Sequence, residues 1–180
     1  MSRGLLREAL QRLTQEGLLV GKRNRGLFVA EFGPDEVFDI YTARTAIERA
    51  ACLKIIDVTK RTDEVYAVLT ELTDRLESSA QAGLSELELA DIDIQFHERM
   101  VEEAHSPRLD RMYATLITET RMCLAALEAP SYPVKQRIAE HRQIAEAIRD
   151  RNVPRLHTLL AEHMDHALEE IRHAFTEREN

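Results

Sequence analysis

The hydrophobic positions of this 180-residue chain recur mostly at helical spacing. From residue 34 onward, apolar residues three and four apart predict one helix after another. These helices are expected over 34–56, 61–81, 86–104, 107–128, 134–150 and 153–176. Clusters of glycine, proline, serine and asparagine separate them, and the connections are short. The pattern therefore predicts an antiparallel bundle of six helices.

The first thirty residues follow a different pattern. Ser2 can cap a helix over residues 3–15, and Gly17 can end it. Two short apolar runs, 18–20 and 27–29, then flank a turn that contains glycine and asparagine, which predicts a β-hairpin. A helix followed by a hairpin is the second half of a winged helix, whose helix enters the major groove and whose wing contacts phosphates or the minor groove. An amphipathic helix and hairpin with ordinary surface charge explains the pattern equally well.

The charge of the chain is unevenly distributed. Residues 1–30 carry six basic and two acidic side chains, a net charge of +4, whereas the other 150 residues carry −12 of the total of −8. A short basic segment on an acidic body is the distribution expected when one part faces nucleic acid. The candidate DNA-binding residues are Ser2, Arg3, Arg7, Arg12, Arg23, Arg25 and Gly26.

The composition excludes several classes of protein. Hydrophobic residues make up 44% of the chain, enough for a core, and no apolar run reaches the roughly 18 residues that span a bilayer. Met1 does not open a signal-peptide pattern. Cys52 and Cys123 are isolated, which argues against a disulfide framework and against a thiolate zinc site. We therefore expect a cytoplasmic protein without a membrane partner.

Four polar residues occupy apolar faces of three predicted helices. Asp93 and His97 are four residues apart and lie on the same side of their helix, and His141 and His163 each replace a hydrophobic residue on another. A lone histidine in such a position is usually a core residue with one hydrogen bond. Four buried polar groups need several partners, however, and one divalent metal ion satisfies all of them. The ligand set suits zinc, nickel, manganese or iron.

Arg44 and Glu48 also lie on an inward face of their helix. One interpretation is a buried ion pair that ties helices together. The other is that Arg44 binds a carboxylate of an effector near the metal, through paired hydrogen bonds. Both remain open from the sequence. The candidate effector-binding residues are therefore Arg44 and Glu48, with Arg121, at the margin of its apolar face, as a weaker candidate for the same role.

The N-terminal segment resembles a known DNA-binding family. Residues 2–13, 16–18 and 25–29 are similar to the recognition helix and wing of the GntR superfamily, FadR-type subfamily. That family usually has Ser-Arg-x-Pro-Val-Arg-Glu-Ala-Leu here, and Leu5 replaces the proline. The family places two further helices before this point, so the resemblance implies a truncated winged helix over residues 1–30, followed by a linker at 31–36.

The body, residues 37–176, resembles the FCD domain, the effector-binding partner of the FadR-type winged helix. The matching stretches are 43–48, 93–97, 140–148 and 159–164. In metal-binding members the ligands fall at the positions of Asp93, His97, His141 and His163, and six helices place the body closer to the VanR-like branch. The resemblance implies a homodimeric transcription regulator in which metal and a small organic acid control affinity for a palindromic operator.

Two other functions compete with this interpretation. Glu102-x-x-His105 and Glu170-x-x-His173 match the ligand motif of di-metal carboxylate enzymes, although they lie mostly toward polar faces and helix ends. A metal hydrolase lacks a convincing general base beside the ligands. A bundle that only dimerises and binds no ligand is the third hypothesis. We expect that the protein is not an enzyme.

Overall fold

A computed structural model describes residues 3–127 and 133–179 of the chain. The chain divides into two compact units, residues 1–33 and 34–180. No described helix has both the length and the apolar character needed to cross a membrane.

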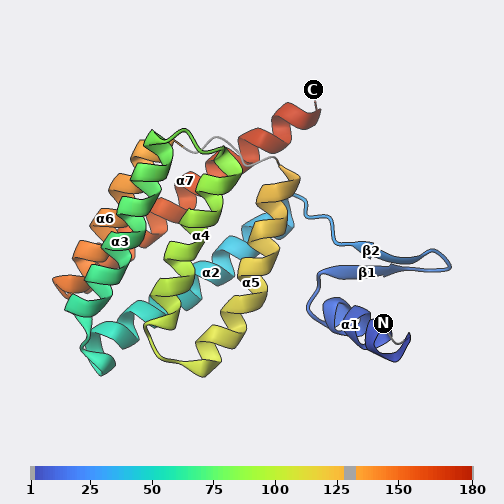
Figure 1. Cartoon of the computed structure of the whole chain (residues 1–180), viewed down its shortest axis with the longest axis horizontal. Helices are drawn as coiled ribbons and strands as arrows, with labels where there is room; N and C mark the ends of the chain where they lie inside the picture. The colour runs from blue at the N-terminus through green and yellow to red at the C-terminus, as the bar shows by residue number, and fades with distance from the viewer. Residues whose placement is uncertain (1–2, 128–132, 180) are drawn as a thin grey trace. The chain divides into compact units, whose positions relative to one another are not determined.

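The first unit is a helix followed by a hairpin, as predicted. Helix α1 spans Arg3–Gln15, and strands β1 (Leu19–Lys22) and β2 (Gly26–Val29) pair in antiparallel fashion, with Leu19 opposite Val29 and Lys22 opposite Gly26 (Figure 1). Gly17 ends α1 with a φ of 77°, a left-handed conformation that suits glycine. Ser2, the predicted cap, lies outside the described residues.

The apolar face of α1 is not buried within this unit. None of the helix residues is buried, and Leu6 is 46% exposed. The hairpin leaves Phe28 and Val29 exposed as well. A single helix and a two-stranded hairpin are too small to enclose a core, which is the physical reason for this exposure.

The second unit is the predicted bundle of helices. Its helices are α2 (Pro34–Lys54), α3 (Thr62–Gln81), α4 (Glu86–Glu102), α5 (Pro107–Ala126), α6 (Val134–Arg149) and α7 (Val153–Glu179). They pack in the closed order α2, α7, α6, α3, α4, α5 and back to α2, and α4 also contacts α2 (Figure 1). The core runs through this ring, and its largest fully buried side chains include Phe96, Leu156 and Leu160.

One end of α2 differs from the prediction. The helix begins at Pro34, where the helix over 34–56 was predicted to begin, so residues 34–36, which were also assigned to the linker, form its first turn. Proline fits there because the first turn of a helix leaves its backbone N–H groups without intrahelical partners. At its other end α2 passes into a π-helical turn, η1 (Ile55–Thr59), which ends at Lys60 with a φ of 55°.

Local sequence signals determine where helices α4 and α5 begin. Ser85 caps α4 in a capping box with Glu88, so that each residue accepts a backbone N–H of the other. Pro107 occupies the first turn of α5. The capping box begins the helix that carries the first two predicted metal ligands.

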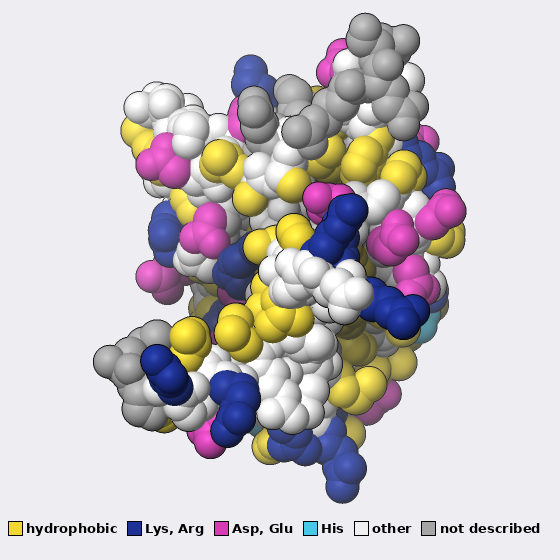
Figure 2. Space-filling model, turned by 90° about the vertical axis from the view of Figure 1, so that its right-hand side faces the viewer, with side chains coloured by type: hydrophobic (Ala, Val, Ile, Leu, Met, Phe, Trp, Pro, Cys, Tyr) yellow, Lys and Arg dark blue, Asp and Glu magenta, His cyan; other side chains and the backbone are white. Residues whose placement is uncertain are grey.

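On the face shown in Figure 2, basic, acidic and hydrophobic side chains are intermixed.

Candidate metal centre

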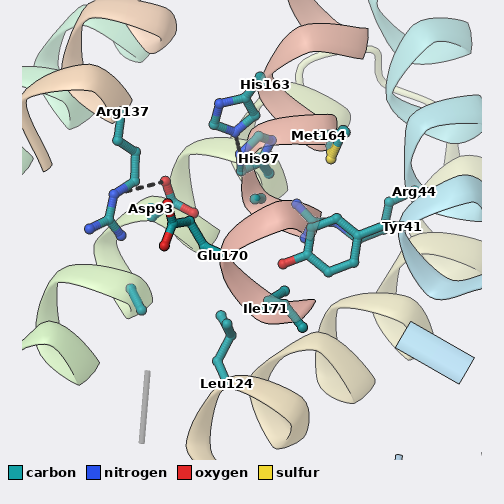
Figure 3. A pocket seen from close by; sticks show the side chains of 12 residues that line it. Tyr41, Arg44, Asp93, His97, Leu124, Arg137, His163, Met164, Glu170 and Ile171 are labelled. Carbon is teal, nitrogen blue, oxygen red and sulfur yellow. Dashed lines mark hydrogen bonds and ion pairs between the residues drawn. The ribbon is translucent and has the colours of Figure 1, made fainter. Parts of the chain in front are cut away.

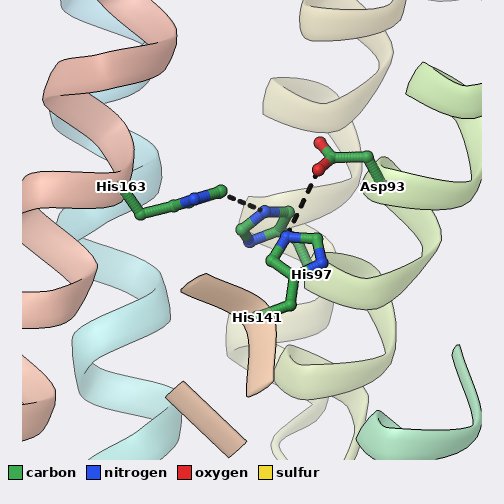
Figure 4. A group of neighbouring side chains, drawn as sticks. All are labelled: Asp93, His97, His141 and His163. Carbon is green, nitrogen blue, oxygen red and sulfur yellow. Dashed lines mark hydrogen bonds and ion pairs between the residues drawn. The ribbon is translucent and has the colours of Figure 1, made fainter. Parts of the chain in front are cut away.

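The structure brings the four predicted ligands together inside the bundle. Asp93 and His97 lie one turn apart on α4, His141 projects from α6 and His163 from α7 (Figure 4). One ligand atom from each of the four lies within 4.8 Å of all the others. The three histidines are buried and Asp93 is half-buried, so the cluster is screened from bulk water.

Two pairs of atoms face one another across the cluster. The Nε2 atoms of His97 and His163 are 3.0 Å apart, and the His141 Nε2 lies 3.2 Å from the Asp93 Oδ1. The second contact is short, but neither of its atoms makes a well-formed hydrogen bond to any described residue. Buried polar atoms without hydrogen bonds are costly, and a shared metal ion would satisfy them.

Carboxylates on the outer side of the cluster orient two of the imidazoles. The His97 Nδ1 is 2.9 Å from the Glu48 Oε2, and the His163 Nδ1 is 2.7 Å from the Glu140 Oε2. An ionised carboxylate only accepts hydrogen bonds, so each Nδ1 carries the proton. Two neutral rings would then direct the lone pairs of their Nε2 atoms at each other across 3.0 Å, and a cation bound between them would remove this repulsion.

His141 is held by stacking. Its ring lies parallel to that of Phe96, with the two centroids 3.9 Å apart. Burial lowers the pKa of His141, and this effect outweighs the attraction of Asp93, so the neutral imidazole is favoured. A neutral imidazole is the form that binds metal.

Asp93 remains ionised in this environment. Burial by itself would raise its pKa, but the interaction with His141 and the charge of Arg137 hold the pKa well below its ordinary value. The Arg137 Nε is 3.9 Å from the Asp93 Oδ1. A carboxylate and three imidazoles thus offer four donor atoms in their metal-binding protonation states.

Glu48 is the centre of a buried hydrogen-bonded group. It pairs with Arg44 at 3.3 Å, accepts a hydrogen bond from the Tyr113 hydroxyl at 2.6 Å, and contacts His97. Burial would raise the pKa of Glu48, but its interactions with His97 and Arg44 lower it to about 2. The predicted ion pair between Arg44 and Glu48 is present, and the same carboxylate also orients a candidate metal ligand.

A pocket opens beside the candidate metal ligands. Its open volume is about 470 Å³, including the part that opens to solvent. Arg44, Arg137 and Glu170 line it together with Asp93, His97 and His163 (Figure 3). The space suits a small ligand that contacts charged groups and the edge of the metal centre.

The other two predicted effector residues lie outside this pocket. Glu48 sits behind His97 and does not line it. Arg121 is directed to the surface of α4, where it forms ion pairs with Glu98 at 2.6 Å and Asp91 at 3.3 Å. Its guanidinium is already occupied by these two carboxylates.

Comparison with known proteins identifies the family. Residues 39–166 match the model of the FCD domain. The chain belongs to the FCD-domain family of GntR-type transcriptional regulators. It is 29% identical over 181 aligned positions to the Nta operon transcriptional regulator of Aminobacter aminovorans, covering 98% of this chain and 83% of that protein. A second relative, the uncharacterized HTH-type transcriptional regulator YdhC of Bacillus subtilis, is 24% identical over 98% of this chain and 78% of its own length.

Solved structures of GntR-type proteins share the fold. E. coli McbR/YncC superposes with a TM-score of 0.79 at 22% identity, covering 97% of this chain and 82% of that one. A putative GntR regulator from Rhodococcus sp. RHA1 gives a TM-score of 0.73 at 21% identity, with 95% and 80% coverage. These matches confirm the prediction of a partial winged helix followed by a helical FCD bundle.

The enzyme hypothesis finds no support in this FCD-domain protein. The relatives and structural neighbours named above are transcriptional regulators or GntR-type proteins. Of the residues in the two di-metal motifs, the side chains of Glu102 and His173 are exposed. The cluster of four donor atoms within the described chain does not include Glu170 or His105.

The predicted DNA-binding residues lie on the first unit. Arg3 and Arg7 are exposed on α1, and Arg23 and Arg25 are exposed in the turn that leads to Gly26. Arg12 is also exposed, but its Nε is bound to Glu16 at 2.8 Å. Within the part of the chain that the structure describes, Arg3, Arg7, Arg23 and Arg25 form no ion pair with an acidic neighbour.

Sequence reasoning missed three residues of the centre. Glu140 orients His163, Arg137 lies beside Asp93, and Tyr113 binds Glu48. The signal for Glu140 was its place directly before His141, where a charged residue adjoins an inward histidine. The partners of Arg137 and Tyr113 come from other helices, so their roles depend on packing that periodicity does not specify.

Proposed function

We propose that this FCD-domain regulator holds one divalent metal ion between Asp93, His97, His141 and His163. A small organic acid binds beside the ion and changes the affinity of the N-terminal helix and hairpin for operator DNA. The observation that carries the proposal is the approach of the His97 and His163 Nε2 atoms to 3.0 Å while each Nδ1 faces a carboxylate.

The donor set supports a transition metal. Three neutral imidazoles and one carboxylate suit zinc, nickel, manganese or iron, whereas calcium and magnesium prefer oxygen ligands. Glu48 and Glu140 supply the outer hydrogen bonds that usually fix the tautomer of metal-bound histidine. The ion would polarise or bind an anionic group that enters the pocket.

The buried charge of Arg44 supports the proposal that the effector is an acid. Its side chain is 3% exposed and lines the pocket. Burial would lower the pKa of Arg44, but the neighbouring Tyr113 and Glu48 raise it above its ordinary value, so the guanidinium remains charged. Guanidinium groups bind carboxylates through paired, charge-assisted hydrogen bonds.

The DNA-binding part of the proposal rests on the first unit and on the family. Its basic residues face solvent on a helix and a hairpin of the type that contacts the major groove and the backbone. A homodimer would present two such helices to a palindromic operator. The effector changes DNA affinity only if it binds the two dimer arrangements with different affinity.

Calorimetric titration of acetate, lactate and succinate tests the coupling of acid to metal. We expect at least one acid to bind the zinc-loaded protein and none to bind the chelator-treated protein. His163→Ala should abolish the binding, whereas His173→Ala, at a side chain that is 71% exposed, should leave it unchanged. Equal binding with and without zinc, or no binding to either form, would contradict the proposal.

A further inference from the structure

Glu170 places a negative charge in a pocket that the proposed function assigns to an acid. It lines the pocket with Arg44 and is half-buried. Among the described residues, none forms a hydrogen bond or ion pair with its carboxylate. A carboxylate in this position repels an effector that carries only negative groups.

The position of Glu170 on α7 directs it toward the metal centre. It follows His163 by seven residues, about two helical turns, and therefore lies on the same face of the helix. Helical side chains lean toward the N-terminus of their helix, so the Glu170 side chain extends back toward His163. Ala167, between the two, also lines the pocket and is too small to separate them.

Both sides of the pocket carry charged groups. In Figure 3, Asp93, Glu170 and Arg137 lie on one side, and Arg44 and Tyr41 lie on the other. Asp93 and Arg137 contact each other, and Asp93 also contacts His141, so the charges of this pair are already compensated. Among the described residues, Glu170 has no such partner, and a ligand that spans the pocket from Arg44 would place its other end against Glu170.

We infer that the effector is an organic acid that also carries a protonated amine, and that Glu170 determines this specificity. The inference rests on the proposed function, because the carboxylate of the same ligand binds beside the metal and Arg44. Glu170 accepts a hydrogen bond from the ammonium group at the opposite side of the pocket. An acid of the same carbon skeleton without the amine leaves Glu170 facing an apolar group, which weakens its binding.

Paired ligands that differ only in the amine test the inference. Zinc-loaded protein is titrated by calorimetry with glycine and acetate, β-alanine and propionate, and aspartate and succinate, and the zinc content is measured after each titration. We expect at least one amino acid to bind tenfold or more tightly than its partner acid, the effect of one charge-assisted hydrogen bond. Amino acids also chelate zinc, so this preference must depend on Glu170.

The variant Glu170→Gln tests whether the preference for amino acids depends on Glu170, and Glu169→Gln is the matched control. Residue 169 is exposed and does not line the pocket. We expect Glu170→Gln to weaken amino-acid binding about tenfold or more while acid binding stays equal or improves, and Glu169→Gln to change neither. An unchanged preference in Glu170→Gln, or acids that bind as tightly as amino acids, overturns the inference but leaves the proposed function standing. If no ligand of either kind binds, the proposed effector role fails as well.

Discussion

At the scale of single residues, the metal centre depends on which ring nitrogen carries the proton. Glu48 and Glu140 each bind an Nδ1 atom, and the Nε2 atoms of His97 and His163 face each other as candidate ligand atoms. Burial lowers the pKa of His141 and so favours its neutral form, and its ring stacks on Phe96. The carboxylates outside the centre therefore support the proposed metal site by orienting its ligands.

Replacing Glu140 tests the role of the outer carboxylates. Glu140→Gln should weaken zinc binding about 10- to 100-fold, because the amide binds the His163 Nδ1 less strongly and can favour the wrong tautomer. Competition with a chromogenic chelator measures the affinity. Glu162→Gln, an exposed neighbour of His163 on α7, is the control and should bind zinc normally. Equal affinities in both variants would show that Glu140 does not support the metal.

The sequence predicted which four residues the structure gathers, because each interrupts an apolar stripe. Asp93 and His97 were also linked to each other by their four-residue spacing. The sequence did not predict Glu140 as a partner of His163 or Arg137 as a partner of Asp93. It also did not predict that Glu48 faces His97. Those contacts join different helices, and the rotation of one helix against the next is set by packing across the whole core.

At the scale of elements, periodicity and caps account for most of the bundle. Helices α3 to α6 begin and end within two residues of their predicted bounds. The π-helical turn η1 was predicted as a continuation of α2 and a short connection, since a five-residue hydrogen-bond pattern has no distinctive composition. Local signals therefore fix where helices form, and packing modifies their ends.

Packing of α7 against the bundle should contribute to the stability of the second unit. Leu156→Ala removes a fully buried side chain and should lower the free energy of unfolding by about 2–5 kcal/mol. Leu87→Ala, at a residue of α4 that is 47% exposed, should change it by less than about 1 kcal/mol. Urea denaturation followed by circular dichroism measures both. Similar effects in the two variants would contradict the assignment of the core.

At the scale of the whole molecule, the two units differ in net charge and in proposed function. The basic first unit is proposed to contact DNA, and the acidic second unit is proposed to bind metal and effector. The sequence predicted this division from the charge distribution and from the change in hydrophobic pattern near residue 30.

Salt-dependent binding to a random-sequence duplex tests the role of the hairpin. Arg23→Ala with Arg25→Ala should weaken binding and reduce the slope of log K against log salt by about 2, because each phosphate contact contributes about 0.9. Arg108→Ala with Arg111→Ala makes the same change in net charge at exposed positions on α5 and should alter the slope little. If both double variants reduce the slope equally, the effect comes from net charge and not from the hairpin.

The central claim is a single metal ion held by four side chains, and elemental analysis of the purified protein tests it most directly. The chain and its Asp93→Ala, His97→Ala double variant are purified, treated with chelator, reconstituted with zinc and desalted, and circular dichroism checks that both remain helical. The account predicts about one zinc ion per chain, lost in the variant. A chain that retains no metal after reconstitution, or a folded variant that retains as much as the original, would contradict it.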